Sequence, residues 1–144
     1  MRRLTIVASL SLSLMVVLSA CAGPGQQAGA NTGQASTAIL PKEMQAAPAR
    51  VRVAYQFAVS HPDALKNVPC YCGCGAMGHT SNLSCYIKER KPDGQIAFDE
   101  HALGCSLCVD ISQDVMRMTG EGKSPQAIRA SIVDAYGKFG PANQ

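Results

Sequence analysis

Apolar residues recur at helical spacing in two parts of the chain, residues 48–60 and residues 105–136. In the first part, the residues at i, i+3, i+4 and i+7 are Val51, Ala54, Tyr55 and Ala58. This periodicity predicts an amphipathic helix, although the valine-rich start is also compatible with a strand. His61 precedes Pro62, and the residue before a proline avoids the helical region, so the element should end there.

The second part predicts two helices joined by a short glycine turn. Their apolar faces are formed by Cys108, Ile111, Val115 and Met118, and by Ile128, Ile132, Ala135 and Tyr136. Gly120 and Gly122 interrupt the pattern between them. Ser124 is a favourable N-cap, and Pro125 at the first helical position loses no hydrogen bond. Gly137 is a natural stop, and the two helices should form an αα-hairpin.

Residues 69–104 lack a long periodic run and are interrupted by glycines and prolines. We expect an irregular region here, with short helical pieces near residues 83–88 and 99–103. The predicted fold class is therefore mostly α, a small Cys-rich helical domain with an irregular Cys/Gly-rich loop region and a C-terminal αα-hairpin.

The N-terminus has the pattern of a secretory signal peptide. Arg2 and Arg3 precede an apolar run over residues 4–18, and the small residues Ser19 and Ala20 follow it. A charged start, a short apolar core and a small-residue cleavage site are typical of such a leader. The run is shorter than the roughly 20 residues that a membrane-spanning helix needs, which favours a cleaved leader over residues 1–20.

The stretch Leu18-Ser19-Ala20-Cys21 resembles the lipobox that the lipoprotein signal peptidase reads. The resemblance implies that Cys21 becomes the mature N-terminus and carries lipid such as palmitate, since two or more acyl chains hold a protein stably to a bilayer. The alternative is an ordinary secreted protein with an incidental cysteine. We expect a lipid-anchored protein on the extracytoplasmic face of a cell membrane. Residues 21–41 would form a flexible, uncharged tether, and residues 42–140 the folded domain.

Composition narrows the function classes. The leader takes two of the 13 Lys and Arg residues, which leaves 11 against 10 Asp and Glu, so nothing suggests a nucleic-acid partner. No Ser/His/Asp arrangement or phosphate loop is present, which disfavours a hydrolase or transferase. Removing Cys21 from seven cysteines leaves six. In an oxidising compartment, an even number indicates disulfides first and a metal site second.

Three of these cysteines alternate with other residues, as Cys70, Cys72 and Cys74. In an extended segment their sulfurs would project to the same side, and in a glycine-broken loop they could wrap around an ion. A Cys-x-Cys pair bridges itself poorly because a disulfide needs a particular separation and torsion. If they are oxidised, the expected partners are Cys85, Cys105 and Cys108.

Cys105 and Cys108 form a Cys-x-x-Cys pair at the start of a predicted helix. The exposed N–H groups and positive dipole end of a helix N-terminus favour a thiolate. A redox nucleophile and a metal ligand both require that form, so the pair indicates sulfur chemistry of either kind.

Clustered thiols with nearby imidazoles suit a soft ion, and copper(I) is favoured, with zinc possible. The predicted ligands are Cys70, Cys72, Cys74, His79, Cys85, His101, Cys105 and Cys108. We expect His61, at the end of an element, to be structural, and Met77 to fill a gap rather than to bind metal.

The chain resembles the family of bacterial extracytoplasmic proteins named for a PCYCGC motif, over roughly residues 47–138. The motif is intact at residues 69–74, and it is followed by Gly78-His79, Ser84-Cys85-Tyr86, His101 and Cys105-x-x-Cys108. The resemblance implies lipoprotein character and a metal-binding role.

The last 35 or so residues are also similar to the helical thiol-reducing subunit of cytochrome c maturation. The matching pieces are Cys105-x-x-Cys108, Gly122-Lys123-Ser124, Ile128 and Tyr136-Gly137-x-Phe139. That resemblance implies an all-α fold and a dithiol that meets apocytochrome or thioredoxin-like partners.

The leading hypothesis is a membrane-tethered domain that binds copper as a metal chaperone or buffer, exchanging the ion with a donor or acceptor protein, rather than an enzyme. One alternative is a thiol-disulfide oxidoreductase whose redox pair is Cys105 and Cys108. Another is an interaction module whose cysteines are all bridged as disulfides.

Overall fold

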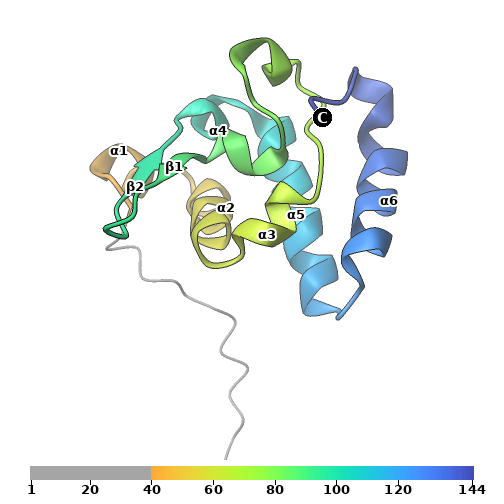
Figure 1. The fold of residues 1–144 in the computed structure, drawn as a ribbon, viewed down its shortest axis with the longest axis horizontal. Coiled ribbons are helices and arrows are strands. Elements are labelled where there is room, and N and C mark those ends of the chain that lie inside the picture. Colours follow the sequence, from red (N-terminus) through yellow and green to blue (C-terminus); the bar gives the residue numbers. More distant parts are fainter. Residues whose placement is uncertain (1–39) are drawn as a thin grey trace, which may run out of the picture. The chain divides into compact units, whose positions relative to one another are not determined.

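Helices account for most of residues 40–144, the part of the chain that the computed structural model describes (Figure 1). In chain order the α-helices, 3-10 helices (η) and strands are α1 (Lys42–Gln45), α2 (Ala49–Ser60), α3 (Pro62–Lys66), η2 (Cys74–Met77), η3 (Asn82–Cys85), β1 (Ile87–Arg90), β2 (Ile96–Phe98), α4 (His101–Gly104), α5 (Ser106–Gly120), α6 (Pro125–Tyr136) and η4 (Gly137–Phe139). The mostly α fold class is therefore confirmed. The predicted leader, Cys21 and most of the predicted tether lie outside the described residues.

Helix α2 confirms the helix predicted at residues 48–60. The four apolar residues of its predicted face are all buried, and the helix packs against α5. His61 is the C-cap of α2, and Pro62 is the first residue of α3, as the proline rule predicts. The imidazole of His61 stacks on the ring of Phe57 with centroids 4.6 Å apart, which agrees with a structural role.

Helices α5 and α6 form the predicted αα-hairpin, and α5 contacts both α2 and α6 (Figure 1). The predicted apolar face of α5 is buried over its whole length. Gly122 has φ of +73°, a left-handed conformation that suits glycine in the connecting turn. The Ser124 hydroxyl accepts a hydrogen bond from the Ala127 N–H at 3.2 Å, which confirms the predicted N-cap.

On α6 the prediction is partly wrong. Ile128 and Ile132 are buried, whereas Ala135 is exposed. The buried face of α6 is therefore narrower than the sequence predicts, because the helix covers α5 from one side of the domain.

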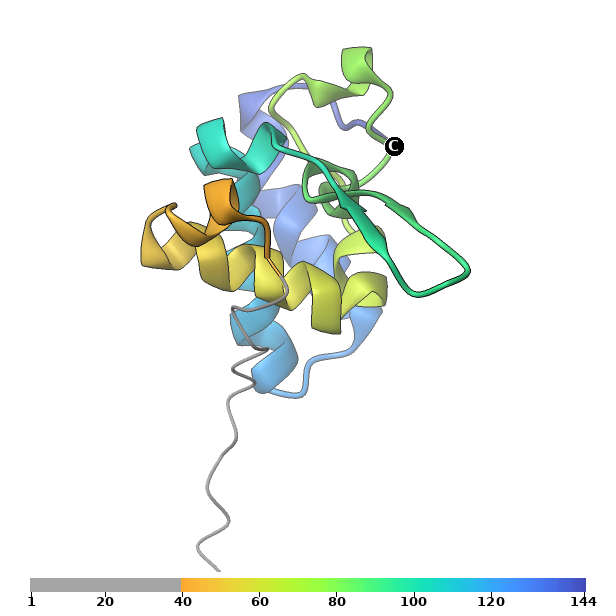
Figure 2. The same ribbon diagram turned by 90° about the vertical axis from the view of Figure 1, so that its left-hand side faces the viewer.

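Residues 69–104 are irregular, as predicted, except for an antiparallel hairpin of β1 and β2 that projects from the helices (Figure 2). The helical piece predicted at residues 83–88 is wrong in its second half, because Ile87 and Lys88 belong to β1. Asp93 and Gly94 form the turn between the strands, with Gly94 at φ +86°. The piece predicted at residues 99–103 corresponds to α4, which begins two residues later, at His101.

The hydrophobic core lies between α2, α5, α6 and η3, and it includes three tyrosines, Tyr55, Tyr71 and Tyr86. The rings of Tyr55 and Tyr86 meet edge to face with centroids 4.9 Å apart. The Tyr55 hydroxyl donates to the Asp99 carbonyl oxygen at 2.7 Å, so α2 holds the segment that leads into α4. Among residues 40–144, no helix has both the length and the apolar character to cross a bilayer.

Candidate metal centre

Seven potential ligands from three parts of the chain converge on one small volume. The loop of residues 69–74, called here the PCYCGC loop, supplies three thiols, η3 supplies one, and the α4–α5 segment supplies two thiols and an imidazole. The seven residues are Cys70, Cys72, Cys74, Cys85, His101, Cys105 and Cys108. We refer to them as the Cys/His cluster.

Cys108 lies at the centre of the Cys/His cluster. Its Sγ is 3.2 Å from that of Cys70, 3.3 Å from those of Cys85 and Cys105, and 3.5 Å from that of Cys72. A disulfide would bring two sulfurs to about 2.05 Å, and all six cysteines within residues 40–144 are free. The cluster is therefore a set of thiols packed sulfur against sulfur.

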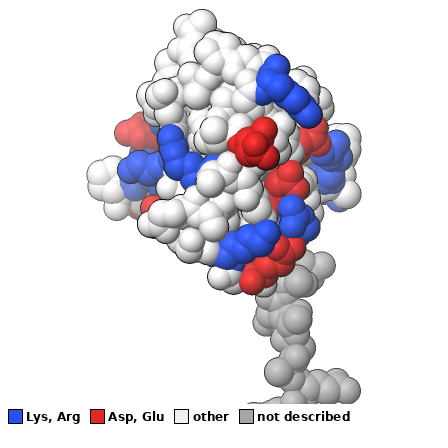
Figure 3. Space-filling view, turned by 90° about the vertical axis from the view of Figure 1, so that its right-hand side faces the viewer, with Lys and Arg blue, Asp and Glu red and all other residues white. Residues whose placement is uncertain are grey.

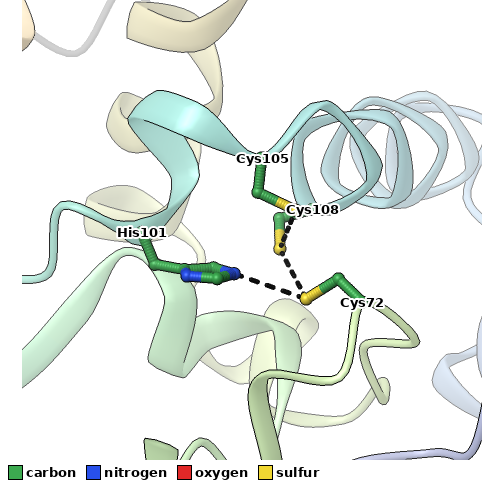
Figure 4. Close-up of side chains that lie close together, drawn as sticks. All are labelled: Cys72, His101, Cys105 and Cys108. Carbon is green, nitrogen blue, oxygen red and sulfur yellow. Dashed lines mark hydrogen bonds between the residues drawn. The ribbon is translucent and has the colours of Figure 1, made fainter.

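The ligand atoms fall into four overlapping groups. Figure 4 shows the largest, in which His101 Nε2 lies 3.4 Å from the Cys72 sulfur and the two thiols of the Cys-x-x-Cys pair lie beside them. Within each group all ligand atoms are within 4.8 Å of one another. The groups are Cys72, His101, Cys105 and Cys108; Cys70, Cys72 and Cys74; Cys70, Cys85 and Cys108; and Cys74, Cys85 and His101.

Glycine shapes the PCYCGC loop so that its three thiols converge. Gly73 stands between Cys72 and Cys74 with φ of +80°, and Gly78 ends η2 with φ of +85°. These left-handed positions turn the chain, and Cys74 already belongs to η2. Of the two arrangements open from the sequence, the loop therefore takes the glycine-broken one rather than an extended strand.

A buried polar network holds Cys108 in place from behind. The Cys108 carbonyl oxygen accepts hydrogen bonds from the Tyr86 hydroxyl at 2.9 Å and from the Asn82 side-chain amide at 3.2 Å. The Ser112 hydroxyl lies 2.7 Å from both of these side chains. Because all of these groups are buried and bonded to one another, the first turn of α5 is fixed relative to η3.

Asn143, near the C-terminus, belongs to the framework of the site. Its Oδ1 accepts from the Cys70 N–H at 2.7 Å, and its Nδ2 donates to the Cys74 sulfur at 3.4 Å and to the Ser81 carbonyl oxygen at 3.3 Å. A Cβ on Gly140 would lie 3.1 Å from a carbonyl oxygen of the loop, so glycine there lets the tail come close. No periodicity or motif in the last residues points to this role.

His79 is not brought into any of the four ligand groups, although it was predicted as a ligand. Its Nε2 lies 3.5 Å from Asp99 Oδ2, and its ring packs edge-on against the His101 ring at 5.2 Å. Asp99 in turn accepts a hydrogen bond from the His101 N–H at 2.8 Å. Asp99 is buried and connects the two histidines. Met77, which was predicted to fill a gap, is instead exposed over 58% of its surface.

The cluster has an inner and an outer part. Cys70, Cys74, Cys85 and Cys108 are buried, whereas Cys72, Cys105 and His101 are partly exposed. Solvent and dissolved ions therefore reach the cluster through its outer part.

The thiols influence one another's ionisation. Hydrogen bonds from the Cys108 and Cys85 thiols lower the pKa of the Cys70 thiol. The pKa of Cys108 is raised, because its thiol is hydrogen-bonded to Cys70 and Cys85 and is buried. Burial is the main cause that raises the pKa values of Cys72 and Cys74. The pKa of Cys70 is thus shifted in the opposite direction to those of Cys72, Cys74 and Cys108, so Cys70 ionises most easily of these four thiols.

The PCYCGC loop lies in an uncharged stretch of the chain, since residues 67–87 contain no Lys, Arg, Asp or Glu. Figure 3 shows acidic and basic side chains interspersed over the middle and lower parts of the face it draws, with a further basic group at the upper right. The segment that carries the PCYCGC loop therefore contributes no carboxylate or cationic side chain of its own.

The arrangement is suited to holding a soft metal ion or to exchanging disulfides. The family described as "Protein of unknown function with PCYCGC motif" matches residues 13–143. No curated protein and no solved structure matches the chain. The similarity to the thiol-reducing subunit of cytochrome c maturation finds no support in these comparisons.

Proposed function

The chain belongs to the family of proteins with the PCYCGC motif, and we propose that it binds copper(I) as a metal chaperone or buffer, anchored by lipid to the extracytoplasmic face of a membrane. The observation that carries the proposal is the convergence of six free thiols and the His101 imidazole on one volume. None of the four ligand groups found among residues 40–144 contains a carboxylate, so their donors are sulfur and nitrogen.

The donor set supports a soft ion. Thiolates select copper(I), zinc and iron–sulfur clusters, whereas magnesium and calcium prefer oxygen. The group of Cys72, His101, Cys105 and Cys108 has the Cys₃His composition of a structural zinc site. A single zinc ion would leave the thiols of Cys70 and Cys85, which lie 3.2 and 3.3 Å from the Cys108 sulfur, without an ion. Copper(I), which takes shared thiolates, uses the whole set, and this favours copper.

The division into inner and outer parts supports a carrier rather than a permanent structural site. In a structural site the protein fills every coordination position, and none is left open for exchange. Here Cys72, Cys105 and His101 are partly exposed. A donor or acceptor protein with its own thiols would exchange the ion through these outer ligands, one metal–sulfur bond at a time, while the buried thiols retain their hold.

The location follows from the N-terminus. Arg2, Arg3, the apolar run and the lipobox-like stretch that ends at Cys21 support export and acylation. The family match begins at residue 13 and so includes Cys21. Outside the cytoplasm, copper(I) would protect the six remaining thiols from oxidation.

The second candidate is a thiol-disulfide oxidoreductase. The sulfurs of Cys105 and Cys108 lie 3.3 Å apart at the start of α5, and Cys105 is the more exposed of the two. In this function the Cys105 thiolate would attack the disulfide of a thioredoxin-like partner and form a mixed disulfide. Cys108 would then release the partner as a dithiol, and the protein would keep the new disulfide.

Copper(I) uptake by the exported, reduced chain tests the proposal. We expect tight binding in competition with a chromogenic copper(I) chelator, and marked weakening in Cys72→Ser, since Cys72 belongs to two ligand groups. Failure of the reduced chain to take up copper(I) would contradict the proposal. For the redox candidate, Cys108→Ser should trap a mixed disulfide through Cys105, and its absence would remove that function.

A further inference from the structure

We propose, on the premise that the cluster binds copper(I), that it holds four ions in one thiolate-bridged assembly rather than a single ion. The proposal rests on how the four ligand groups share their members, which a one-metal site would not require. For this purpose we name them group A (Cys70, Cys72, Cys74), group B (Cys70, Cys85, Cys108), group C (Cys72, Cys105, Cys108, His101) and group D (Cys74, Cys85, His101).

Every pair of groups has one residue in common. Group A shares Cys70 with B, Cys72 with C and Cys74 with D; group B shares Cys108 with C and Cys85 with D; and groups C and D share His101. This is the connectivity of a tetrahedron whose corners are metal ions and whose edges are bridging ligands.

His101 is the one shared ligand that departs from this pattern. A thiolate bridges two ions readily, but an imidazole nitrogen binds only one. If His101 binds the ion of group D, group C still has three thiols because Cys105 belongs to it alone. Five bridging thiolates and two terminal ligands, Cys105 and His101, then give each of the four ions three ligands. Trigonal coordination is common for copper(I), and no described member of the cluster is left over.

The distances agree with such a cluster. With a metal–sulfur distance of about 2.3 Å, as in zinc thiolates, a trigonal ion separates its sulfurs by about 4.0 Å. The close sulfur–sulfur contacts range from 3.2 Å for Cys70–Cys108 to 3.8 Å for Cys74–Cys85, and all ligand atoms within a group lie within 4.8 Å of one another. Loading therefore needs side-chain movements of a fraction of an ångström and no rearrangement of the backbone.

The protein also stabilises the negative charge that such a cluster would carry. Four copper(I) ions bound by six thiolates would form a cluster of net charge −2. The N-terminus of α5, a helix of 15 residues, carries Cys105 as its N-cap and Cys108 in its first turn, so its positive dipole end faces the sulfurs. The Asn143 amide adds an N–H donor to the Cys74 sulfur. Both interactions favour a buried anionic cluster.

The two cysteines of the Cys-x-x-Cys pair provide matched variants. Cys108 contacts four other sulfurs and bridges groups B and C, whereas Cys105 is a terminal ligand of group C. Cys108→Ser should therefore lose at least two ions. Cys105→Ser should lose at most one ion, although Cys105 and Cys108 are only three positions apart at the N-terminus of α5.

The experiment is a titration of the reduced, full-length exported chain with copper(I) in detergent and without oxygen, followed by native mass spectrometry and copper X-ray absorption. We expect saturation at four ions per chain, with metal-free and four-copper species dominating at partial loading, and a copper–copper scattering contribution. Saturation at any other number, four ions without copper–copper scattering, or equal losses in Cys105→Ser and Cys108→Ser would overturn the cluster while leaving copper binding intact. No copper uptake would overturn the proposed function together with the cluster.

Discussion

Asn143 ties the C-terminal tail to the PCYCGC loop, and Asn143→Ala tests whether the tail is part of the framework of the site. The substitution removes three side-chain hydrogen bonds, to the Cys70 N–H, the Cys74 sulfur and the Ser81 carbonyl oxygen. The strongest of them, at 2.7 Å, satisfies the backbone N–H of a fully buried residue.

The magnitude follows from these contacts. A buried donor left without a partner costs about 1–3 kcal/mol, and an ordinary hydrogen bond contributes about 0.5–1.5 kcal/mol. The two hydrogen bonds donated by the Asn143 amide nitrogen are long, and one of them ends on sulfur. Each therefore contributes near the lower end of the range for an ordinary hydrogen bond. We expect Asn143→Ala to lower the free energy of unfolding of the metal-free, reduced protein by about 2 kcal/mol. At roughly 4–8 °C per kcal/mol for a domain of this size, Tm should fall by about 10 °C.

Thermal and urea unfolding followed by circular dichroism, with reductant and a metal chelator present, measure this effect. The neighbouring Gln144→Ala is the matched control, because Gln144 is exposed and its side chain forms hydrogen bonds with Lys66 and Arg129 rather than with the PCYCGC loop. It should change the free energy of unfolding by less than about 0.5 kcal/mol. Equal effects of the two substitutions would refute the structural role assigned to Asn143.

Three further outcomes are expected. His101→Ala should weaken copper(I) binding at least about tenfold, equivalent to about 1.4 kcal/mol, while His79→Ala should change it less; chelator competition measures both, and equal losses would contradict the ligand assignment. Gly73→Ala should destabilise the apo-protein by about 1–2 kcal/mol in urea unfolding, because alanine is strained at a φ of +80°. No atom lies near the added Cβ, so a steric clash does not contribute. Gly104→Ala is the control, since it has equal space and no positive φ and should leave the free energy of unfolding unchanged by strain. Burial raises the pKa of the Cys72 thiol, which is therefore protonated in the metal-free protein and must lose its proton when it binds metal. The copper(I) affinity should consequently fall as the pH is lowered. Equal affinities at pH 6 and pH 8, measured by the same chelator competition, would contradict this.

The helical part of the fold was predictable because its signals are local. The apolar spacing in α2 and α5 and the Ser124–Pro125 start of α6 depend only on neighbours in the chain. The β1–β2 hairpin was missed because β1 is short and three of its four residues are charged and exposed, which hides the alternation of a strand. The Pro92-Asp93-Gly94 turn was the signal available for it.

The candidate site was predictable in composition but not in geometry. The sequence indicates that all six cysteines carry sulfur chemistry, yet it cannot place Cys108 at their centre, because that depends on how η3 and α5 pack. His79 and His101 have similar spacings to cysteines, and only the fold directs one at Cys72 and the other at Asp99. Asn143 gave no signal because its contacts are entirely long-range.

The most direct test of metal binding is a combined count of metal and reactive thiols on the exported protein. It would be purified without oxygen or reductant from cells grown with copper, and its thiols labelled with a maleimide before and after treatment with a copper(I) chelator. We expect bound copper, with the six cluster cysteines protected from the label until the chelator removes the metal. Six sulfurs locked in disulfides, with no copper taken up after mild reduction, would contradict the proposed function.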